Sequence, residues 1–146
     1  MNDVFLCIGN REGGDDAVGP YIADKLESSK NVINCETTPE NYTSVIKKQK
    51  PERLLIIDAA DMNLKPGEIR IIPKEKIGLM TISTHGIPIS LLIKYLEKTV
   101  ENILFIGIQP ENMSGEMSDD VKKSADRLIQ MIYQDKIKQI KVFIKN

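Results

Sequence analysis

Short apolar runs alternate along this chain with stripes of apolar residues at helical spacing. Runs typical of buried strands occupy residues 4–8, 32–35, 54–57 and 103–108. Helical spacing begins near residue 16 and continues to residue 26, and it recurs over residues 42–48, 89–96 and 118–132. Strands that alternate with helices indicate a parallel sheet covered on both faces. We therefore expect an α/β fold with three layers, α/β/α.

Two segments modify this picture. Pro66-Gly67 marks a turn, and residues 68–72 after it are typical of a strand at the edge of the sheet. The sheet is therefore expected to be mixed although mostly parallel, with residues 4–8 as its first, central strand. The last residues, 136–146, fit either a basic amphipathic helix or an edge strand, and the pattern does not choose between them.

Composition limits the classes of function. The 146 residues fit a single domain, residues 1–146, and carry 20 Lys+Arg against 21 Asp+Glu for a net charge of -1. We expect no nucleic-acid partner and no membrane insertion, because there is no global basic field and no apolar run near the ~18 residues of a spanning helix. The start of the chain lacks the pattern of a signal peptide, which predicts a cytoplasmic protein.

Two cysteines, Cys7 and Cys35, stand far apart without C-x-x-C spacing. Neither a disulfide framework nor a thiolate metal site is indicated, and both thiols are expected to be reduced.

Three side chains at predicted loops could form a common site. Asp16 follows the first strand, Asp58 ends the third, and His85, the one histidine of the chain, precedes a helix. Ligands of open parallel sheets bind beyond the carboxyl ends of the strands. Two carboxylates and an imidazole at that edge can move protons or bind a divalent ion with positions left open for another molecule. Their convergence depends on strand order, which one sequence does not give.

Each of these residues also has an ordinary interpretation. Asp15 and Asp16 can be acids that cap a helix and complement its dipole. Asp58 can be a turn residue whose carboxylate binds nearby backbone, and His85 can be a solvated loop residue. The spacing alone leaves these alternatives open.

Other chemistries have weaker support. The segment from Gly9 to Gly14 could cradle a phosphate, but it lacks both G-x-G-x-x-G and G-K-[ST], and the acids that follow would repel an anion. Cys35 and His85 could form a nucleophile and base, although Cys35 is explained as a small buried residue at a strand end. The serines near His85 lack the Gly-x-Ser-x-Gly context of a hydrolase.

Longer segments resemble a known family. Residues 6–10, LCIGN, followed by residues 14–20, GDDAVGP, resemble the N-terminal signature of hydrogenase maturation endopeptidases, which trim the large subunits of [NiFe]-hydrogenases. The branch that serves the hydrogenase of formate hydrogenlyase is similar in further segments, in the same order. These are Thr38–Asn41, residues 54–62 and 66–72, Thr84-His85 and Gly107–Pro110. The resemblance spans roughly residues 3 to 133.

This resemblance implies a function. A peptidase of this kind removes the C-terminal extension of the large-subunit precursor after nickel insertion, and it reads the nickel in its substrate. By motif, Asp16, Asp58 and His85 would be the catalytic and metal-contacting residues. Nickel would come with the precursor, and no organic cofactor is expected. Asp15 would be a helix cap that aims Asp16, and Asn10 would hold the loop by side-chain hydrogen bonds.

Two rival functions remain open at this point. One is a binding module or chaperone that docks on an immature metalloprotein without cutting it. The other is a metallohydrolase with a tightly held zinc ion of its own. The sequence does not identify the hydrogenase that is processed, the length of the removed peptide or the oligomeric state.

Overall fold

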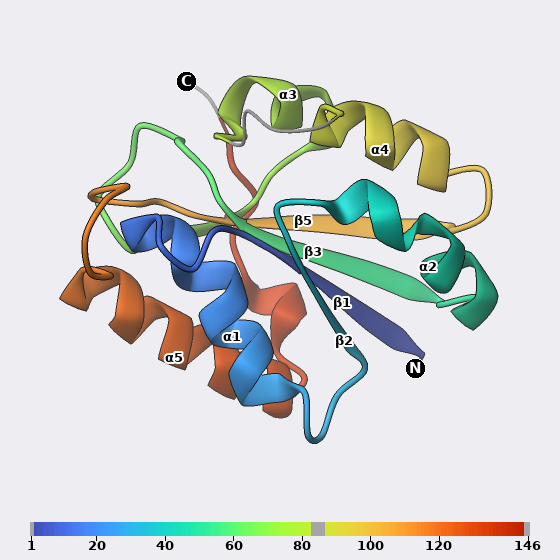
Figure 1. Ribbon diagram of the computed structural model, residues 1–146, viewed down its shortest axis with the longest axis horizontal. Coiled ribbons are helices and arrows are strands. Elements are labelled where there is room, and N and C mark those ends of the chain that lie inside the picture. The colour runs from blue at the N-terminus through green and yellow to red at the C-terminus, as the bar shows by residue number, and fades with distance from the viewer. Residues whose placement is uncertain (1, 83–86, 145–146) are drawn as a thin grey trace.

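The computed structural model describes residues 2–82 and 87–144, and it has a five-stranded sheet at its centre (Figure 1). The strands are β1 (Asp3–Ile8), β2 (Val32–Glu36), β3 (Arg53–Ala59), β4 (Ile69–Ile71) and β5 (Asn102–Ile108). Their order is β2-β1-β3-β5-β4. All neighbouring pairs are parallel except β4 and β5, which are antiparallel at the edge. The mixed, mostly parallel sheet is thus confirmed, with β3 in the middle and β1 beside it.

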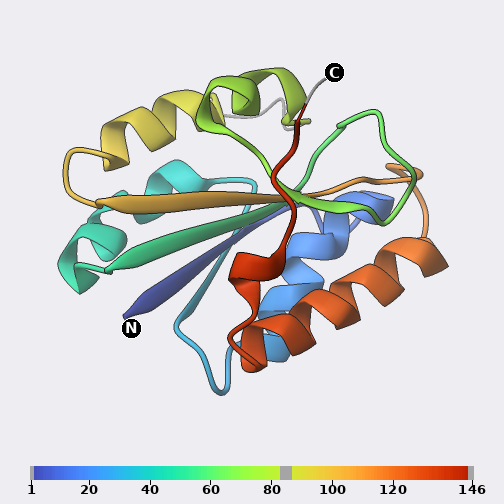
Figure 2. The same ribbon diagram turned by 180° about the vertical axis from the view of Figure 1, so that it is seen from behind.

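Helices cover both faces of the sheet. The α-helices are α1 (Val18–Leu26), α2 (Thr43–Gln49), α3 (Ile77–Met80), α4 (Ile89–Leu96) and α5 (Asp119–Tyr133). The short 3-10 helices are η1 (Gly14–Ala17), η2 (Pro39–Tyr42), η3 (Lys74–Lys76) and η4 (Ile137–Gln139). Figures 1 and 2 show α1 and α5 on one face and α2, α3 and α4 on the other, which confirms the three layers. The short helices η3 and α3 were not predicted from the sequence.

The layers enclose two apolar cores, one on each side of the sheet. In β3, Leu55 and Ile57 pack in the core beneath α1 and α5, whereas Leu54 and Ile56 pack in the core beneath α2 and α4. All seven residues of β3 are buried, and residues 54–57 form a continuous apolar run without hydrophobic and polar alternation.

The tail resolves the choice left open by its sequence. After η4, the backbone runs beside β4: Ile71 N–H donates to the Lys141 carbonyl over 2.8 Å, and Phe143 N–H donates to the Ile71 carbonyl over 2.8 Å. Val142 forms a parallel bridge with Ile71. The edge-strand alternative therefore describes residues 141–143, because pairing with β4 satisfies backbone groups that an open edge would leave to water.

The winding of the chain places a crevice between β1 and β3. From β1 the chain passes through α1 to β2 on one side, and from β2 it passes through α2 to β3 on the other side of β1. This reversal is the topological switch point at which open α/β sheets bind their ligands, beyond the carboxyl ends of the strands. No helix in the described part of the chain is long and apolar enough to span a bilayer.

Candidate active site

Asp16 and Asp58 meet at the switch point. Asp16 lies on η1, directly after β1, and Asp58 is the penultimate residue of the neighbouring strand β3. Helix η1 contacts β3, and the charge of Asp16 is near enough to raise the pKa of Asp58. The structure therefore brings together two of the three predicted side chains.

Asp58 is an aspartate in an apolar setting. It is 1% exposed, and its Oδ2 atom has no hydrogen-bond partner among the described residues. Burial is the main cause that raises the pKa of Asp58 well above its ordinary value, and the charge of Asp16 adds to it, while the backbone of Ala59 acts in the opposite direction. A buried acid with an unused acceptor atom beside a second acid is suited to a cation or a donated proton.

The turn that carries Asp16 is held tightly against β1. At Gly9, φ is 156°, and a Cβ atom would lie 2.0 Å from the Asp16 carbonyl oxygen. The Asn10 backbone N–H donates to Asp16 Oδ2 over 3.1 Å, and the Asn10 side-chain oxygen accepts from Glu12 N–H over 3.0 Å. The predicted role of Asn10 in holding this loop is confirmed. The Asn10 N–H group therefore binds the carboxylate of Asp16 and is not available to a phosphate, which argues against the phosphate-cradle alternative.

Asp15 has a role other than the predicted one. It was expected to cap the helix that follows and so to aim Asp16, but neither η1 nor α1 has a side-chain cap. Asp15 is fully buried and accepts hydrogen bonds from Glu111 N–H at 2.7 Å, Asn112 N–H at 3.0 Å and Ser118 N–H at 2.7 Å. The Ser118 hydroxyl donates as well. The capping prediction is wrong, because these donors come from the loop before α5.

These bonds decide the charge state of Asp15. Burial alone would raise the pKa of Asp15, but the donors of Asn112, Ser118 and Glu111 outweigh it and lower the pKa. Gly14 allows the close approach of the two segments: its φ is 62°, and a Cβ atom there would lie 2.6 Å from Ser114 N. Asp15 thus joins the loop at residues 111–118 to the turn that carries Asp16.

Gln109 organises the loop that follows β3. Its side-chain oxygen accepts from Met62 N–H over 2.7 Å and Leu64 N–H over 3.3 Å, and its amide group donates to Asp61 over 3.2 Å. In the sequence, Gln109 stands out only as part of the resemblance, within Gly107–Pro110. A buried amide at the end of a strand is the signal that could have identified this role.

Glu40 is a second residue that sequence reasoning did not single out. It lies on η2, which follows the carboxyl end of β2, and its Oε2 atom is buried without a hydrogen-bond partner in the described chain. An acid just after a strand is the same signal that drew attention to Asp58. The third predicted residue, His85, lies outside the described residues, as do Ser83 and Thr84.

The described residues contain no cluster of three or more His, Cys, Asp or Glu side chains that could hold a metal. Asp16 and Asp58 supply two carboxylate side chains, and the third member of the predicted set, His85, lies outside this part of the chain. An ion held largely by another molecule's ligands would fit such a set.

The two cysteines do not provide a nucleophile. Burial, followed by the charges of Asp58 and Asp24, raises the pKa of Cys7 to about 12. Burial also raises the pKa of Cys35, with further increases from Cys7 and Asp58, and its thiol donates to the Cys7 carbonyl over 3.2 Å. Both are free cysteines. The interpretation of Cys35 as a small buried residue therefore holds over the nucleophile alternative.

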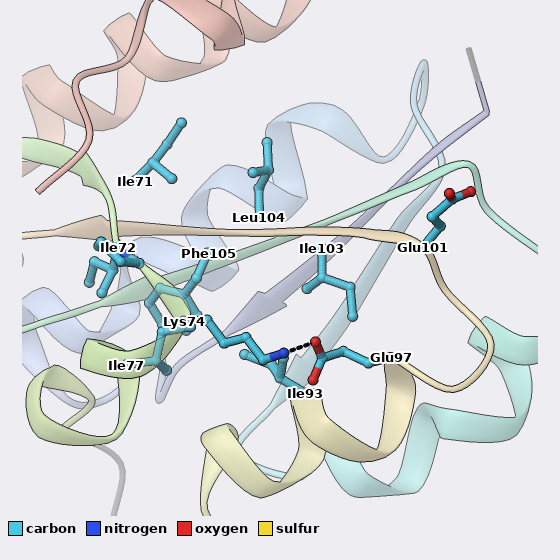
Figure 3. Close-up of a pocket in the computed structure, with 11 residues that line it drawn as sticks. Ile71, Ile72, Lys74, Ile77, Ile93, Glu97, Glu101, Ile103, Leu104 and Phe105 are labelled. Atoms are coloured by element: carbon cyan, nitrogen blue, oxygen red, sulfur yellow. Dashed lines mark hydrogen bonds and ion pairs between the residues drawn. The ribbon is translucent and has the colours of Figure 1, made fainter.

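A well-formed cavity elsewhere is separate from this site. Its volume is about 210 Å³, and apolar side chains of β4, β5, α3 and α4 line it, with an ion pair between Lys74 and Glu97 at its side (Figure 3). It adjoins residues 103–105 of β5, whereas Asp58 is in register with Gly107 near the other end of that strand. The cavity therefore does not open beside the two acids.

Comparison with known proteins agrees with this geometry. The sequence profile of the hydrogenase maturation protease family matches residues 20–135. The chain belongs to the hydrogenase maturation protease family. The match includes Asp58 and His85 and begins just after Asp16. Members of this family are peptidases, and the predicted family and enzyme class are confirmed.

Individual relatives give the same result. The hydrogenase 3 maturation protease of Escherichia coli K12 is 43% identical over 116 residues, which cover 76% of this chain and 74% of the relative. A putative hydrogenase maturation protease of Methanocaldococcus jannaschii is 37% identical and covers 90% of this chain and 86% of the relative. The solution structure of the endopeptidase HycI from E. coli superposes with a TM-score of 0.84 at 38% identity, with coverage of 92% and 90%.

Proposed function

We propose that this peptidase removes the C-terminal extension of a [NiFe]-hydrogenase large-subunit precursor after nickel insertion, and that the nickel is part of what it recognises. The observation that carries the proposal is the environment of Asp58, whose buried Oδ2 atom lacks a partner in the described chain beside the acid Asp16. Leaving such an atom unpaired costs about 1–3 kcal/mol, which a bound cation would offset. Asp16, Asp58 and His85 would be the metal-contacting residues.

The chain's own residues would then act by positioning. Asp58 is fixed by the central strand, and Asp16 is held by the backbone N–H of Asn10, so both carboxylates are oriented before substrate arrives. Nickel in the precursor supplies a Lewis acid that can polarise the scissile carbonyl or a water molecule. A precursor without nickel would supply no cation to offset the cost of ionising Asp58 in its buried position beside Asp16. This supports a peptidase that discriminates loaded from empty precursor.

The test uses the hydrogenase large-subunit precursor encoded in the same genome, in nickel-free and nickel-loaded forms. After incubation with the purified protein, intact mass spectrometry reads the C-terminus. We expect loss of a C-terminal peptide from the nickel-loaded form alone. Cleavage of both forms would contradict nickel recognition, whereas unchanged mass together with stable binding would replace the peptidase by a non-cutting binding module.

Variants test the ligand set. We expect Asp16→Asn and His85→Ala to abolish processing without loss of the fold, because loop ligands at a sheet edge support little packing. Asp24→Asn is the matched control: Asp24 binds Arg11 on the surface, with its side chain 48% exposed, and lies outside the site. Processing at the normal rate by either ligand variant would refute the set. The cytoplasmic location expected from the sequence stays a prediction.

A further inference from the structure

Helix α4 carries apolar side chains on its outer face. Ile87, just before the helix, and Leu91 and Tyr95 within it are 39%, 53% and 43% exposed. Leu91 and Tyr95 lie four residues apart on one side of α4, and Ile87 lines the same hollow as they do. We call these three residues the α4 stripe. The apolar residues that face the core of the protein are a different set: Ile89, Leu92, Ile93 and Leu96. The α4 stripe is therefore in excess of what the fold needs.

The α4 stripe lines a hollow with a uniformly basic border. The hollow has a volume of about 440 Å³ and is lined by the stripe together with Lys94 and Lys98. Lys47 of α2 reaches Tyr95 from the side: it donates to the Tyr95 hydroxyl, and its Nζ atom lies 4.1 Å from the ring centroid. Of the described residues that line this hollow, none is acidic.

The acid that directly follows α4 belongs to another surface. Glu97 pairs with Lys74 of η3, beside the separate cavity shown in Figure 3. The basic border of the α4 stripe therefore keeps its charge, and the surface would attract carboxylates while its centre attracts apolar side chains.

The position of the stripe links it to the proposed active site. Ile87 is two residues after His85 in the sequence, and from Leu91 to Tyr95 the stripe rises about 6 Å along α4. In the sequence, the stripe therefore begins directly after the segment that contains the third predicted ligand.

We propose that the α4 stripe and its lysines dock a segment of the hydrogenase precursor next to its cleavage site, a segment with apolar side chains bordered by carboxylates. This inference rests on the proposed function and adds to it a surface that sets affinity. A second copy of this chain is a poorer occupant. A two-fold pairing would place the same surface on both sides and oppose Lys94 and Lys98 to their own copies.

The test measures processing of nickel-loaded precursor over a range of concentrations. We expect Leu91→Asp, and separately the double variant Lys94→Glu/Lys98→Glu, to raise KM about tenfold, as for a central interface residue, with kcat within about twofold of the parent. Raising the salt concentration should raise the parent's KM and lower that of the double variant, because screening weakens attraction in the parent and repulsion between like charges in the variant.

The matched control is Lys123→Glu/Arg127→Glu. These exposed residues have the same spacing of four on α5, which covers the opposite face of the sheet (Figures 1 and 2). KM should not change in this variant. The midpoint temperature of thermal unfolding is measured for every variant. A midpoint within a few degrees of the parent's excludes loss of the fold as the cause of a change in KM.

Three outcomes would overturn the inference, and each is distinct. Unchanged KM in both α4 variants, with the parent active, would refute the docking role of the α4 stripe and leave the proposed function intact. An inactive parent would instead refute the proposed function. A concentration-dependent dimer that Leu91→Asp dissociates, seen by light scattering, would make a second copy the occupant.

Discussion

Asp15 and Asp58 are both buried carboxylates, and they lie on two neighbouring segments of the same sheet edge. Asp15 is 0% exposed and accepts from the backbone of Glu111, Asn112 and Ser118. Asp58 is 1% exposed, and its Oδ2 atom has no partner in the described chain. The pKa of Asp15 is lowered because hydrogen bonds outweigh burial, whereas burial and the charge of Asp16 raise the pKa of Asp58.

Hydrogen-bond donors, more than burial, distinguish the environment of Asp15 from that of Asp58, the acid proposed to contact the substrate's metal. The donors around Asp15 stabilise its charged form, so ionised Asp15 contributes to the stability of the fold. Asp58 has the backbone of Ala59 as a donor, but its Oδ2 atom has no partner in the described chain, and the fold holds it at a free-energy cost that a ligand can recover. Substitution of each acid by its amide should therefore have opposite effects on stability.

The largest expected effect is that of Asp58→Asn on processing. If Asp58 contacts the substrate's nickel, the neutral amide should reduce the rate by more than about a hundredfold, since even outer residues of metal sites have effects of about 10–100-fold. The measurement is a time course of precursor cleavage by intact mass. A rate near that of the parent would mean that Asp58 is a buried acid without the proposed role.

The same substitution should stabilise the metal-free protein. Asn removes a buried charge whose Oδ2 atom has no partner in the described chain, which favours the folded state by about 1–3 kcal/mol near neutral pH. The folded-state pKa of Asp58 is raised, so its contribution to stability is present below the unfolded pKa and is lost as pH rises through the folded one. The advantage of Asn should therefore be small at about pH 4 and grow as pH increases. Urea unfolding at several pH values gives this curve, and a destabilised Asn variant would break the comparison.

Asp15→Asn should lower the stability of the fold, the opposite of the effect expected for Asp58→Asn. Its effect on processing should be smaller than that of Asp58→Asn. The amide nitrogen would face N–H donors at residues 111–118, and we expect a loss of about 3 kcal/mol in the free energy of unfolding. Asp24→Asn is the control, because this exposed acid also has a lowered pKa from its bond to Arg11, yet screening limits its loss to at most about 1 kcal/mol.

Acid titration sharpens this expectation. The lowered pKa of Asp15 means that its stabilising contribution is present above its ordinary pKa, about 3.9, and is lost as pH falls toward the folded value. The difference in unfolding free energy between the parent and Asp15→Asn should shrink over that acidic interval. Equal losses for Asp15→Asn and Asp24→Asn would show that the loop does not depend on the buried carboxylate.

The sequence predicted the layered fold well because its signals are local. The run at residues 54–57 is apolar on both faces, which is possible only for an interior strand, and the turn at Pro66-Gly67 indicated the edge strand after it. The strand order that places β1 beside β3 is a long-range property, and it could not be obtained from one sequence. The proximity of Asp16 to Asp58 depends on that order.

The sequence predicted the acidic residues of the candidate site, but it did not predict the hydrogen bonds that surround them. Asp15 was expected to act on its own helix because local capping is the common use of an acid there. Its donors lie about a hundred residues away, beyond the reach of any local pattern. Gln109 was missed for the same reason, since its partners Met62 and Leu64 belong to another loop.

The smallest expected effect concerns the two thiols near Asp58. Cys7 and Cys35 are 0% and 1% exposed, and the charge of Asp58 contributes to the raised pKa of each after burial. Their reaction with iodoacetamide at pH 8 should be about a thousandfold slower in the folded protein than in urea, because the thiolate is the reactive form. Intact mass counts the labelled thiols. Rapid labelling of the folded protein would mean that water reaches the end of β3, and the contrast between Asp15 and Asp58 would then lose its physical basis.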